Sequence, residues 1–590
     1  MRKFTDINNR NELADFLSIK RGWLTYILYF SDIDNYYKTF DIPKKNGGVR
    51  QIKAPIGNLK YIQKRLAVAL QDCQKEINEN NKLFWKVSHG FEKGKSIITN
   101  AKVHRNKRYV INFDLEDFFD SFHFGRVKGF FEKNKYFKLS EEVALCIAQL
   151  TCYKGTLPQG APTSPVITNL IAPILDFRLL KIAKKYKLDY TRYADDLTFS
   201  TNNIHFLDIK DEFCDELTKE INKAGFKLND NKTRLQFKDS RQIVTGLVVN
   251  KKINIERNFY KKTRAMAHSL YQNGEFFIDG KKGTMKQLEG RFSFIDSIDK
   301  YNNKVDDIKH SSSNLNGREK EYKKFLFYKY FFMNDLPLIV TEGKTDIIYI
   351  KAALKKLCTK YPQLIEEDDN KYNFMLSFFE RSKRFRYLFG MSQDGADTIK
   401  NIYNCYVDGK NEDIRFPNYF KILSVLCNVK PHNPVILIFD NEIINREKPL
   451  YKFFNSIKFE NNEIKEQLKE KLIRENWIKL PLQVKKDNNN EKRIKEINND
   501  NNLFLMTVPI INGKTESEIE DLFNKKTLEI KIKGKSLDRT GKKDRDKFYT
   551  KDEFSRYIME HYDKINFSGF EKLLDIIDAI LKEYKKENVQ

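Results

Sequence analysis

The sequence has few cysteines, and none of them are closely paired. Seven Cys are scattered through 590 residues. There is no Cys-x-x-Cys pair and no histidine cluster at the spacing of zinc ligands. The sequence therefore gives no indication of a zinc site, and it predicts reduced thiols, as in a cytosol.

Long apolar runs are also missing. No apolar stretch approaches the roughly 20 residues that a helix needs to cross a bilayer. Residues 1–6 are not followed by the apolar core of a signal peptide. We therefore expect a soluble, cytoplasmic protein with no membrane partner.

Acidic residues are outnumbered by basic ones. The chain has 107 Lys and Arg against 81 Asp and Glu, which gives a formal net charge of +26. Together with 46 Phe and 29 Tyr, this excess suits phosphate contacts and base stacking. Basic surfaces also occur on proteins that bind acidic partners or membranes, so charge supports a polynucleotide partner only together with specific motifs. The length predicts more than one domain.

The most informative motif is Tyr193-Ala194-Asp195-Asp196, which lies between two short β-like runs. Adjacent side chains of a strand point to opposite faces, so a tight turn is needed to bring both carboxylates together. Upstream, another β-like run ends in Asp114, which can supply a third carboxylate. Clustered acids repel one another unless a divalent cation is present. Two magnesium ions roughly 3.5–4 Å apart would suit attack of an oxygen on a phosphate.

The order of these motifs resembles the palm of reverse transcriptases. Between the acidic segments, a Pro/Gly loop with Gln159 and Gly160 leads into an apolar helix. The resemblance implies an α+β right-hand polymerase (fingers, palm, thumb) over residues 1–310, with fingers and palm to about 245 and the thumb at about 246–310. It implies RNA-directed DNA polymerase activity on deoxynucleoside triphosphates, with Asp114, Asp195 and Asp196 catalytic, two Mg²⁺ as cofactors, and Gln159 and Gly160 binding substrate.

Further segments resemble other blocks of the same family. Arg50, in a Gly-rich fingers strand, is expected to bind the triphosphate, because its planar fork can hold two oxygens. Lys232 could approach the leaving pyrophosphate, and a surface turn explains it equally well. Phe119 occupies the place of a bulky ring beneath the incoming sugar, where it would exclude a 2′-hydroxyl; it could also belong to the core with its neighbouring phenylalanines.

Two short motifs point to one branch, the bacterial retron reverse transcriptases. They are the Asn-Ala-x-x-His form from Asn100 to His104, and Val244-Thr245-Gly246. The resemblance implies a structured noncoding RNA as primer and template, and a branched RNA–DNA product. It places Asn100 and His104 among the substrate-binding residues, although a hydrogen-bonded structural histidine explains His104 at least as well.

A basic run follows the Val-Thr-Gly block, where the retron family places its thumb. Within it, Lys261, Lys262 and Arg264 are expected to grip the duplex from a helix. A solvated basic helix face is the alternative.

The second half of the chain begins after a polar break. We expect a linker and docking helix over residues 311–335. Two apolar strands then each end in acids, Glu342 in the first and Asp440 and Glu442 in the second. Apolar strands that alternate with helices indicate a buried parallel sheet, which holds ligands beyond the carboxyl ends of its strands.

Gly343-Lys344-Thr345 is not a P-loop, because the first glycine of that motif is absent. A strand-ending Glu-Gly followed by a strand-ending Asp-x-acid instead resembles the Toprim (Rossmann-like) domain of OLD-family nucleases, although the usual second motif is Asp-x-Asp. The resemblance implies a metal-dependent nuclease over residues 336–530 with insertions, holding one or two Mg²⁺ through Glu342, Asp440, Glu442 and, in an acidic helix, Glu520. The alternatives are a plain α/β module with acidic helix caps, or an ordinary helix start at Glu520.

Residues 531–590 are expected to form a helical extension, which could pack on the sheet or bind a partner. The sequence thus predicts a retron-type reverse transcriptase fused to a nuclease effector in antiphage defence, with a nucleic-acid target for the effector. Two alternatives remain: a non-catalytic Toprim-like binding module, or a reverse transcriptase of another mobile element. The sequence does not indicate the oligomeric state.

Overall fold

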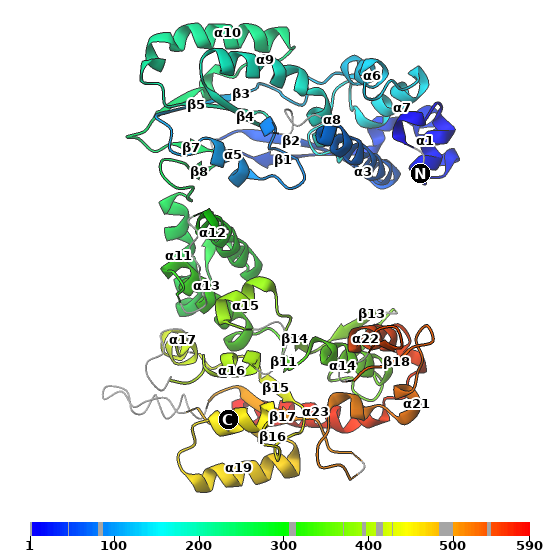
Figure 1. Cartoon of the computed structure of the whole chain (residues 1–590), viewed down its shortest axis with the longest axis vertical. Helices are drawn as coiled ribbons and strands as arrows, with labels where there is room; N and C mark the ends of the chain where they lie inside the picture. The colour runs from blue at the N-terminus through cyan, green and yellow to red at the C-terminus, as the bar shows by residue number, and fades with distance from the viewer. Residues whose placement is uncertain are drawn as a thin grey trace. The chain divides into compact units, whose positions relative to one another are not determined.

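The computed structural model describes residues 3–44, 47–80, 86–305, 314–369, 371–391, 397–408, 417–427, 429–482, 500–511, 513–539 and 544–589. The chain divides into two compact units, Met1–Arg257 and Asn258–Gln590, which Figure 1 shows in one chain. The first part of the predicted linker, residues 311–313, lies outside the described residues.

The first unit is built on an antiparallel sheet with the strand order β4-β5-β3-β6. Its strands are β3 (Tyr109–Asp114), β4 (Asp189–Tyr193), β5 (Asp196–Thr201) and β6 (Arg234–Phe237). The central strands β3 and β5 are almost wholly buried. Helices α9 (Pro173–Lys185) and α10 (Lys210–Lys223) lie on one side of this sheet and α5 (Ile97–Val103) on the other (Figure 1).

The remaining elements of the first unit surround this sheet or precede it. Two further pairs of strands are β1 (Tyr37–Pro43) with β2 (Val49–Pro55), and β7 (Ile243–Val244) with β8 (Leu247–Val248). The other helices are α1 (Arg10–Phe16), α2 (Arg21–Thr25), α3 (Gly57–Asn80), α6 (Phe124–Lys133), α7 (Glu141–Thr151) and α8 (Ser164–Ile171). Short helical turns lie at Phe4–Asp6, Tyr26–Phe30, Ile33–Tyr36, Ile204–Ile209 and Asp230–Lys232.

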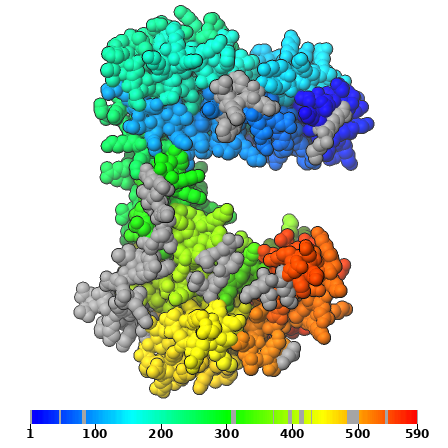
Figure 2. All heavy atoms as spheres, viewed as in Figure 1, coloured from blue at the N-terminus to red at the C-terminus, as the bar shows by residue number. Residues whose placement is uncertain are grey.

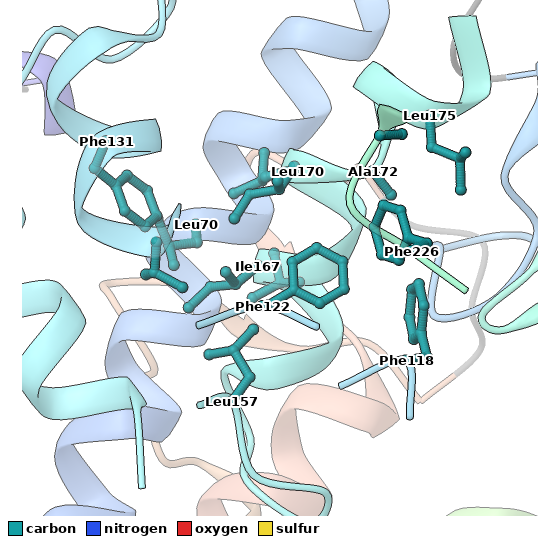
Figure 3. Close-up of a cluster of buried hydrophobic side chains, with 14 of the residues drawn as sticks. Leu70, Phe118, Phe122, Phe131, Leu157, Ile167, Leu170, Ala172, Leu175 and Phe226 are labelled. Atoms are coloured by element: carbon teal, nitrogen blue, oxygen red, sulfur yellow. The ribbon is translucent and has the colours of Figure 1, made fainter. Parts of the chain in front are cut away.

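The core of the first unit contains a cluster of phenylalanines from the segment that follows β3. Phe118 and Phe122 are buried and pack edge to face, with ring centroids 5.1 Å apart, and Phe226 stacks on Phe118. Figure 3 shows these rings together with Leu157 and Ile167. Because buried aromatic rings interdigitate without voids, this cluster gives the residues that follow β3 a fixed support.

The second unit starts within α11 (Arg257–Asn273), well before the boundary near residue 310 that the sequence suggested. Helices α11, α12 (Met285–Val305) and α13 (Gly317–Phe327) share one apolar cluster with the strands that follow. Leu270, Phe292 and Phe325 belong to it, as does Leu338 of the sheet. The region expected as the thumb is therefore packed into the second unit, because its apolar side chains are buried there. The expected docking helix is α13 with a helical turn at Tyr328–Phe332.

The buried parallel sheet expected in the second half is present. Its five strands have the order β14-β11-β15-β17-β16. Strands β14 (Ser377–Phe378), β11 (Leu338–Thr341), β15 (Val435–Phe439) and β17 (Leu503–Thr507) run parallel, and β16 (Trp477–Lys479) pairs antiparallel with β17. Every residue of β11, β15 and β17 is buried, which accounts for their continuous apolar sequence.

Helices and small strand pairs complete the second unit. The helices are α14 (Lys344–Lys356), α15 (Lys383–Phe389), α16 (Asp397–Tyr403), α17 (Tyr419–Cys427), α18 (Pro449–Ser456), α19 (Asn462–Glu475), α21 (Lys525–Leu528), α22 (Lys551–Glu560) and α23 (Glu571–Val589). The strand pairs are β9 (Phe277–Ile278) with β10 (Lys281–Lys282), β12 (Ile365–Asp368) with β13 (Lys371–Phe374), and β18 (Ser536–Leu537) with β19 (Phe548–Tyr549). Short helical turns lie at Ile519–Leu522, Tyr562–Lys564 and Ser568–Phe570.

The C-terminal extension packs on the sheet, one of the two alternatives left by the sequence. Leu573, Leu574 and Ile577 of α23 are fully buried in one cluster with Ile436 and Phe504 of the strands. Figure 2 shows the extension in orange and red at the surface of the second unit. Its apolar stripe at helical spacing therefore covers one face of the sheet.

Candidate active sites

The three predicted aspartates of the first unit lie together. Asp114 ends β3 and pairs with Asp196, the first residue of β5. Cross-strand partners have neighbouring side chains on one face of a sheet. Asp195 occupies the turn between β4 and β5, and its carbonyl oxygen accepts a 3.1 Å hydrogen bond from the backbone N–H of Leu115. A turn of two residues thus brings Asp195 beside the end of β3.

These carboxylates raise one another's pKa values. The pKa of Asp195 is raised by burial and by the charge of Asp114, and Lys232 and Arg50 oppose the rise. Surrounding protein atoms and repulsion from Asp195 and Asp114 raise the pKa of Asp196 to about 7, although its side chain is still open to solvent. Oxygen donors that repel one another are the ligands that magnesium prefers, so this donor set fits a divalent cation.

A pocket of about 500 Å³ opens beside the aspartates, and residues predicted from distant parts of the sequence line it. Arg50, Phe119, Gln159 and Lys232 all contribute to its wall, with Asp114 and Asp195. The Lys232 ammonium lies 2.7 Å from Oδ1 of Asp114, which favours a role at the site over the alternative of an unrelated surface turn. Phe119 is half-buried, with its ring 5.5 Å from that of Phe118, so it faces the pocket and also packs on the core.

Gly160 does not line this pocket but fixes one of its walls. The backbone N–H of Lys53 donates a 2.8 Å hydrogen bond to the carbonyl oxygen of Gln159. At Gly160, φ is +122°, and an added Cβ would lie 2.7 Å from Cγ2 of Ile52. The Gln-Gly loop can therefore approach β2 only because residue 160 has no side chain.

Asn100 and His104, predicted to bind substrate, are both buried, which favours the structural alternative for His104. Both side chains have no exposed surface. The two ring nitrogens of His104 lie 2.7 Å from the hydroxyls of Ser200 and Thr191. Burial, with smaller contributions from Lys107 and His89, lowers the pKa of His104 to about 3. The histidine is therefore a neutral core residue that joins α5 to strands β4 and β5.

The basic residues expected on the thumb lie on a helix, as predicted. Lys261, Lys262 and Arg264 are all exposed on α11, while Thr263 and Ala267 of the same helix are buried. This arrangement fits nucleic-acid binding and also a solvated helix face.

Sequence reasoning missed the residues that hold the aspartate turn from behind. Arg192 and Asp176 form a fully buried ion pair, and Asn169 contacts the guanidinium of Arg192 and the carbonyl oxygen of Gly90. A charged residue in the middle of a β-like run, directly before the acidic tetrapeptide, was the signal that could have found Arg192.

In the second unit, Glu342 and Asp440 lie at the carboxyl ends of adjacent parallel strands. Glu342 follows β11, Asp440 follows β15, and Oε1 of Glu342 accepts a 3.1 Å hydrogen bond from the backbone N–H of Asp440. Asp346, which the sequence analysis did not single out, joins them from the first turn of α14. Burial comes first among the causes that raise the pKa of Glu342 to about 7 and of Asp346 to about 6; neighbouring acids add to it. The pKa of Asp440 is raised well above its usual value by burial, Glu342 and Asp346.

The other two predicted acids of this region are paired with lysines. Glu442 is buried and forms an ion pair with Lys448. Glu520 is also buried, with Oε1 3.0 Å from Nζ of Lys551 in the C-terminal extension. Glu520 still belongs to the group, because it raises the pKa of both Asp346 and Asp440.

Across the described ranges, no three His, Cys, Asp or Glu side chains already have the arrangement of a metal cluster. The lysine partners explain this in part, since Lys232 and Lys448 each hold a carboxylate that the sequence assigned to a metal.

Two further findings concern the whole described chain. All seven cysteines are free thiols. In the part of the chain that the structure describes, we find no helix with the length and apolar character of a membrane span.

Comparisons with known proteins agree with the geometry of the first site. Residues 42–260 match the family model "Reverse transcriptase (RNA-dependent DNA polymerase)". The chain is 33% identical over 296 residues to the retron Ec86 reverse transcriptase of Escherichia coli, covering 50% of this chain and 85% of that protein. It is 35% identical over 251 residues to the retron Mx65 reverse transcriptase of Myxococcus xanthus, covering 40% of this chain and 56% of that protein.

A more remote likeness links the chain to solved telomerases. The telomerase of Candida albicans, in complex with a fragment of telomeric RNA, is 11% identical, with a TM-score of 0.31 over 67% of this chain and 66% of that one. This likeness is too low to carry an argument. The retron relatives disfavour the alternative of a reverse transcriptase from another mobile element. They show that the chain belongs to the family of bacterial retron reverse transcriptases, which are RNA-directed DNA polymerases.

Proposed function

We propose that the first half of the chain copies a structured noncoding RNA into DNA and leaves a branched RNA–DNA product. The observation that carries this proposal is the convergence of Asp114, Asp195 and Asp196 beside a pocket lined by Arg50 and Lys232. Two magnesium ions, when bound, would stabilise the attacking and leaving oxygens of the phosphoryl transfer.

The chain's own residues have separate tasks in this reaction. The three aspartates would hold the ions, and their mutual repulsion leaves them ready to accept positive charge. Arg50 would bind the triphosphate oxygens, and Lys232 would leave Asp114 to approach the pyrophosphate as it departs. Phe119 would support the sugar from the palm side of the pocket.

The test is to purify the protein from its native locus and to sequence the nucleic acid that accompanies it. A branched molecule, in which DNA begins at a 2′-hydroxyl of an RNA guanosine, is the expected result. Asp195→Asn should abolish this product and leave the RNA bound. An unbranched product, or none in the wild type, would contradict the proposal.

For the second half we propose a metal-dependent Toprim nuclease that acts as the effector of an antiphage system. The supporting observation is the group Glu342, Asp346 and Asp440 at the carboxyl ends of parallel strands, with raised pKa values. Open α/β sheets bind ligands at this edge, and clusters of perturbed carboxylates are typical of metal-dependent sites.

The rival to this second proposal is a Toprim-like module that binds the RNA–DNA hybrid without cutting. Incubation of the complex with labelled DNA, messenger RNA and transfer RNA, in the presence of magnesium, distinguishes the two. A nuclease predicts cleavage that Glu342→Gln and Asp440→Asn abolish. A binding module predicts that both variants leave cellular toxicity and phage resistance unchanged.

A further inference from the structure

The turn that carries Asp195 has a backbone conformation that its own residues do not favour. Ala194 has φ +57°, a value that residues with a side chain rarely adopt. Such a conformation persists only where the surrounding structure holds it. The position of Asp195 therefore depends on the contacts that hold this turn.

Arg192 supplies the first of these contacts. Its Nε and one terminal nitrogen each donate a 2.8 Å hydrogen bond to a different oxygen of Asp176 on α9. Its other terminal nitrogen lies 3.3 Å from the carbonyl oxygen of Ala194 and 3.5 Å from Oδ1 of Asn169. The planar guanidinium thus links the turn to two helices at once.

Gly90 supplies the second contact. An added Cβ at Gly90 would lie 2.5 Å from the backbone nitrogen of Ala194, so this segment lies directly against the turn. Nδ2 of Asn169 donates a 2.8 Å hydrogen bond to the carbonyl oxygen of Gly90. The backbone N–H of His89 donates a hydrogen bond of the same length to the carbonyl oxygen of Arg192. Asn169 therefore joins the segment that contains Gly90 to the guanidinium of Arg192.

We propose that Arg192, Asp176, Asn169 and Gly90 form a clamp that fixes the turn of Asp195 in its reactive position. None of the side chains of Arg192, Asp176 or Asn169 lines the pocket beside the aspartates, and Arg192 and Asp176 are almost completely buried. They are positioning residues, because they reach the reaction only through the backbone of Ala194. Their loss should slow the chemical step and leave the binding of nucleotide unchanged.

Gly90→Ala is the sharpest test, because it removes no charge and no hydrogen-bonding group. The new Cβ must displace the turn or its own segment. Since a displacement of about 1 Å can cost about a hundredfold in rate, we expect kcat for single-nucleotide extension on a primed RNA template to fall about a hundredfold. KM for the deoxynucleotide should stay within about twofold, because the Cβ would meet the backbone of Tyr193 and Ala194 and neither Arg50 nor Lys232, the residues expected to hold the triphosphate. Hydrogen–deuterium exchange of residues 190–200 should become faster.

Gly129→Ala is the matched control. Gly129 lies in α6, with open space where a Cβ would go and no positive φ. The kcat of Gly129→Ala and its hydrogen–deuterium exchange should therefore equal those of the wild type. A wild-type kcat for Gly90→Ala would overturn the clamp. So would a loss of activity that only follows the loss of folded protein and leaves local exchange unchanged.

Arg192→Lys provides a second, independent test, since the buried positive charge is retained. A single ammonium cannot make the same fixed set of bonds to Asp176, Ala194 and Asn169. We expect a lower kcat with unchanged KM, and Arg178→Lys, on the same helix as Asp176, should have no effect on either. Equal kcat for Arg192→Lys and the wild type would show that the charge alone suffices and would overturn the positioning role of the guanidinium.

Discussion

At the scale of single residues, both sites contain carboxylates that hold protons more tightly than isolated acids do. Burial is the first cause that raises the pKa of Glu342 to about 7. Asp196 is open to solvent, and surrounding protein atoms and the neighbouring aspartates raise its pKa to about 7. Such groups are costly to ionise in the absence of a cation, so they oppose folding at high pH. This property can be measured without knowing either substrate.

Glu342→Gln should change how stability depends on pH. In the unfolded chain the pKa of this carboxyl is near its usual value of 4.5, and in the folded chain it is about 7. Wild-type stability therefore falls as pH rises between these values, because only the unfolded state releases the proton easily. In chelator, the variant should be more stable than the wild type at pH 8 by about 2–3 kcal/mol, and the difference should vanish near pH 4.5. Calorimetry of the full chain at several pH values measures this difference in stability. Glu470→Gln, on the exposed side of α19, is the control. Parallel pH profiles of stability for Glu342→Gln and the wild type would contradict the prediction.

Phe119→Ala should admit ribonucleotides. The ring lines the pocket beside Asp114, and removing it leaves room for a 2′-hydroxyl. We expect the preference for deoxynucleotides in single-nucleotide extension to fall by about 10- to 100-fold, the range that one steric contact provides. Phe177→Ala, at an exposed position on α9, is the control. Unchanged discrimination would leave Phe119 with its core role alone.

His104→Ala should destabilise the first unit without affecting RNA binding. The substitution creates a cavity and leaves the hydroxyls of Ser200 and Thr191 without their partner. We expect a loss of about 2–4 kcal/mol in the free energy of unfolding, and unchanged RNA affinity below the melting temperature. His205→Ala, at an exposed site, should alter neither. Wild-type stability combined with weaker RNA binding would restore a direct role for His104.

At the scale of secondary-structure elements, the sequence predicted what local patterns determine. The acidic hairpin of β4 and β5, the basic helix α11 and the buried parallel strands β11 and β15 were all expected from spacing and apolar runs. The sequence did not reveal the partners that tertiary packing supplies. Asp176 neutralises Arg192 from another element, 16 residues earlier in the chain. Lys551 likewise neutralises Glu520 from a separate helix. A single sequence contains no signal for such pairings.

The burial of α23 leads to a prediction at this scale. Leu574 is fully buried against the sheet, so Leu574→Asp places a charge in an apolar environment. We expect the second unit to lose at least about 3 kcal/mol of stability and to become sensitive to limited proteolysis. Ala579→Asp introduces the same charge on the exposed side of α23 and should leave proteolysis unchanged. Equal resistance of the two variants would mean that the extension does not support the sheet.

At the scale of the whole molecule, one chain combines an enzyme that makes a nucleic acid with a second acidic site in a separate compact unit. The residues expected as the thumb belong to the same unit as the second site, with Leu270 of α11 and Leu338 of β11 in one apolar cluster. Nucleic acid bound along α11 could therefore influence the second unit through continuous packing. Restraint of the effector by the RNA–DNA product follows as a hypothesis from this arrangement.

Polymerase-deficient and effector-deficient variants test the hypothesis when they are combined. If the product restrains the effector, Asp195→Asn should make expression of the chain toxic, because no hybrid is formed, while the second site keeps its acids. The double variant Asp195→Asn/Glu342→Gln should be harmless, since the second site is then impaired as well. Colony counts after induction measure both outcomes, and wild-type protein freed of its nucleic acid should cut labelled substrates faster than the intact complex. A harmless Asp195→Asn single variant, together with equal cutting by the free protein and the complex, would show that the hybrid does not restrain the effector.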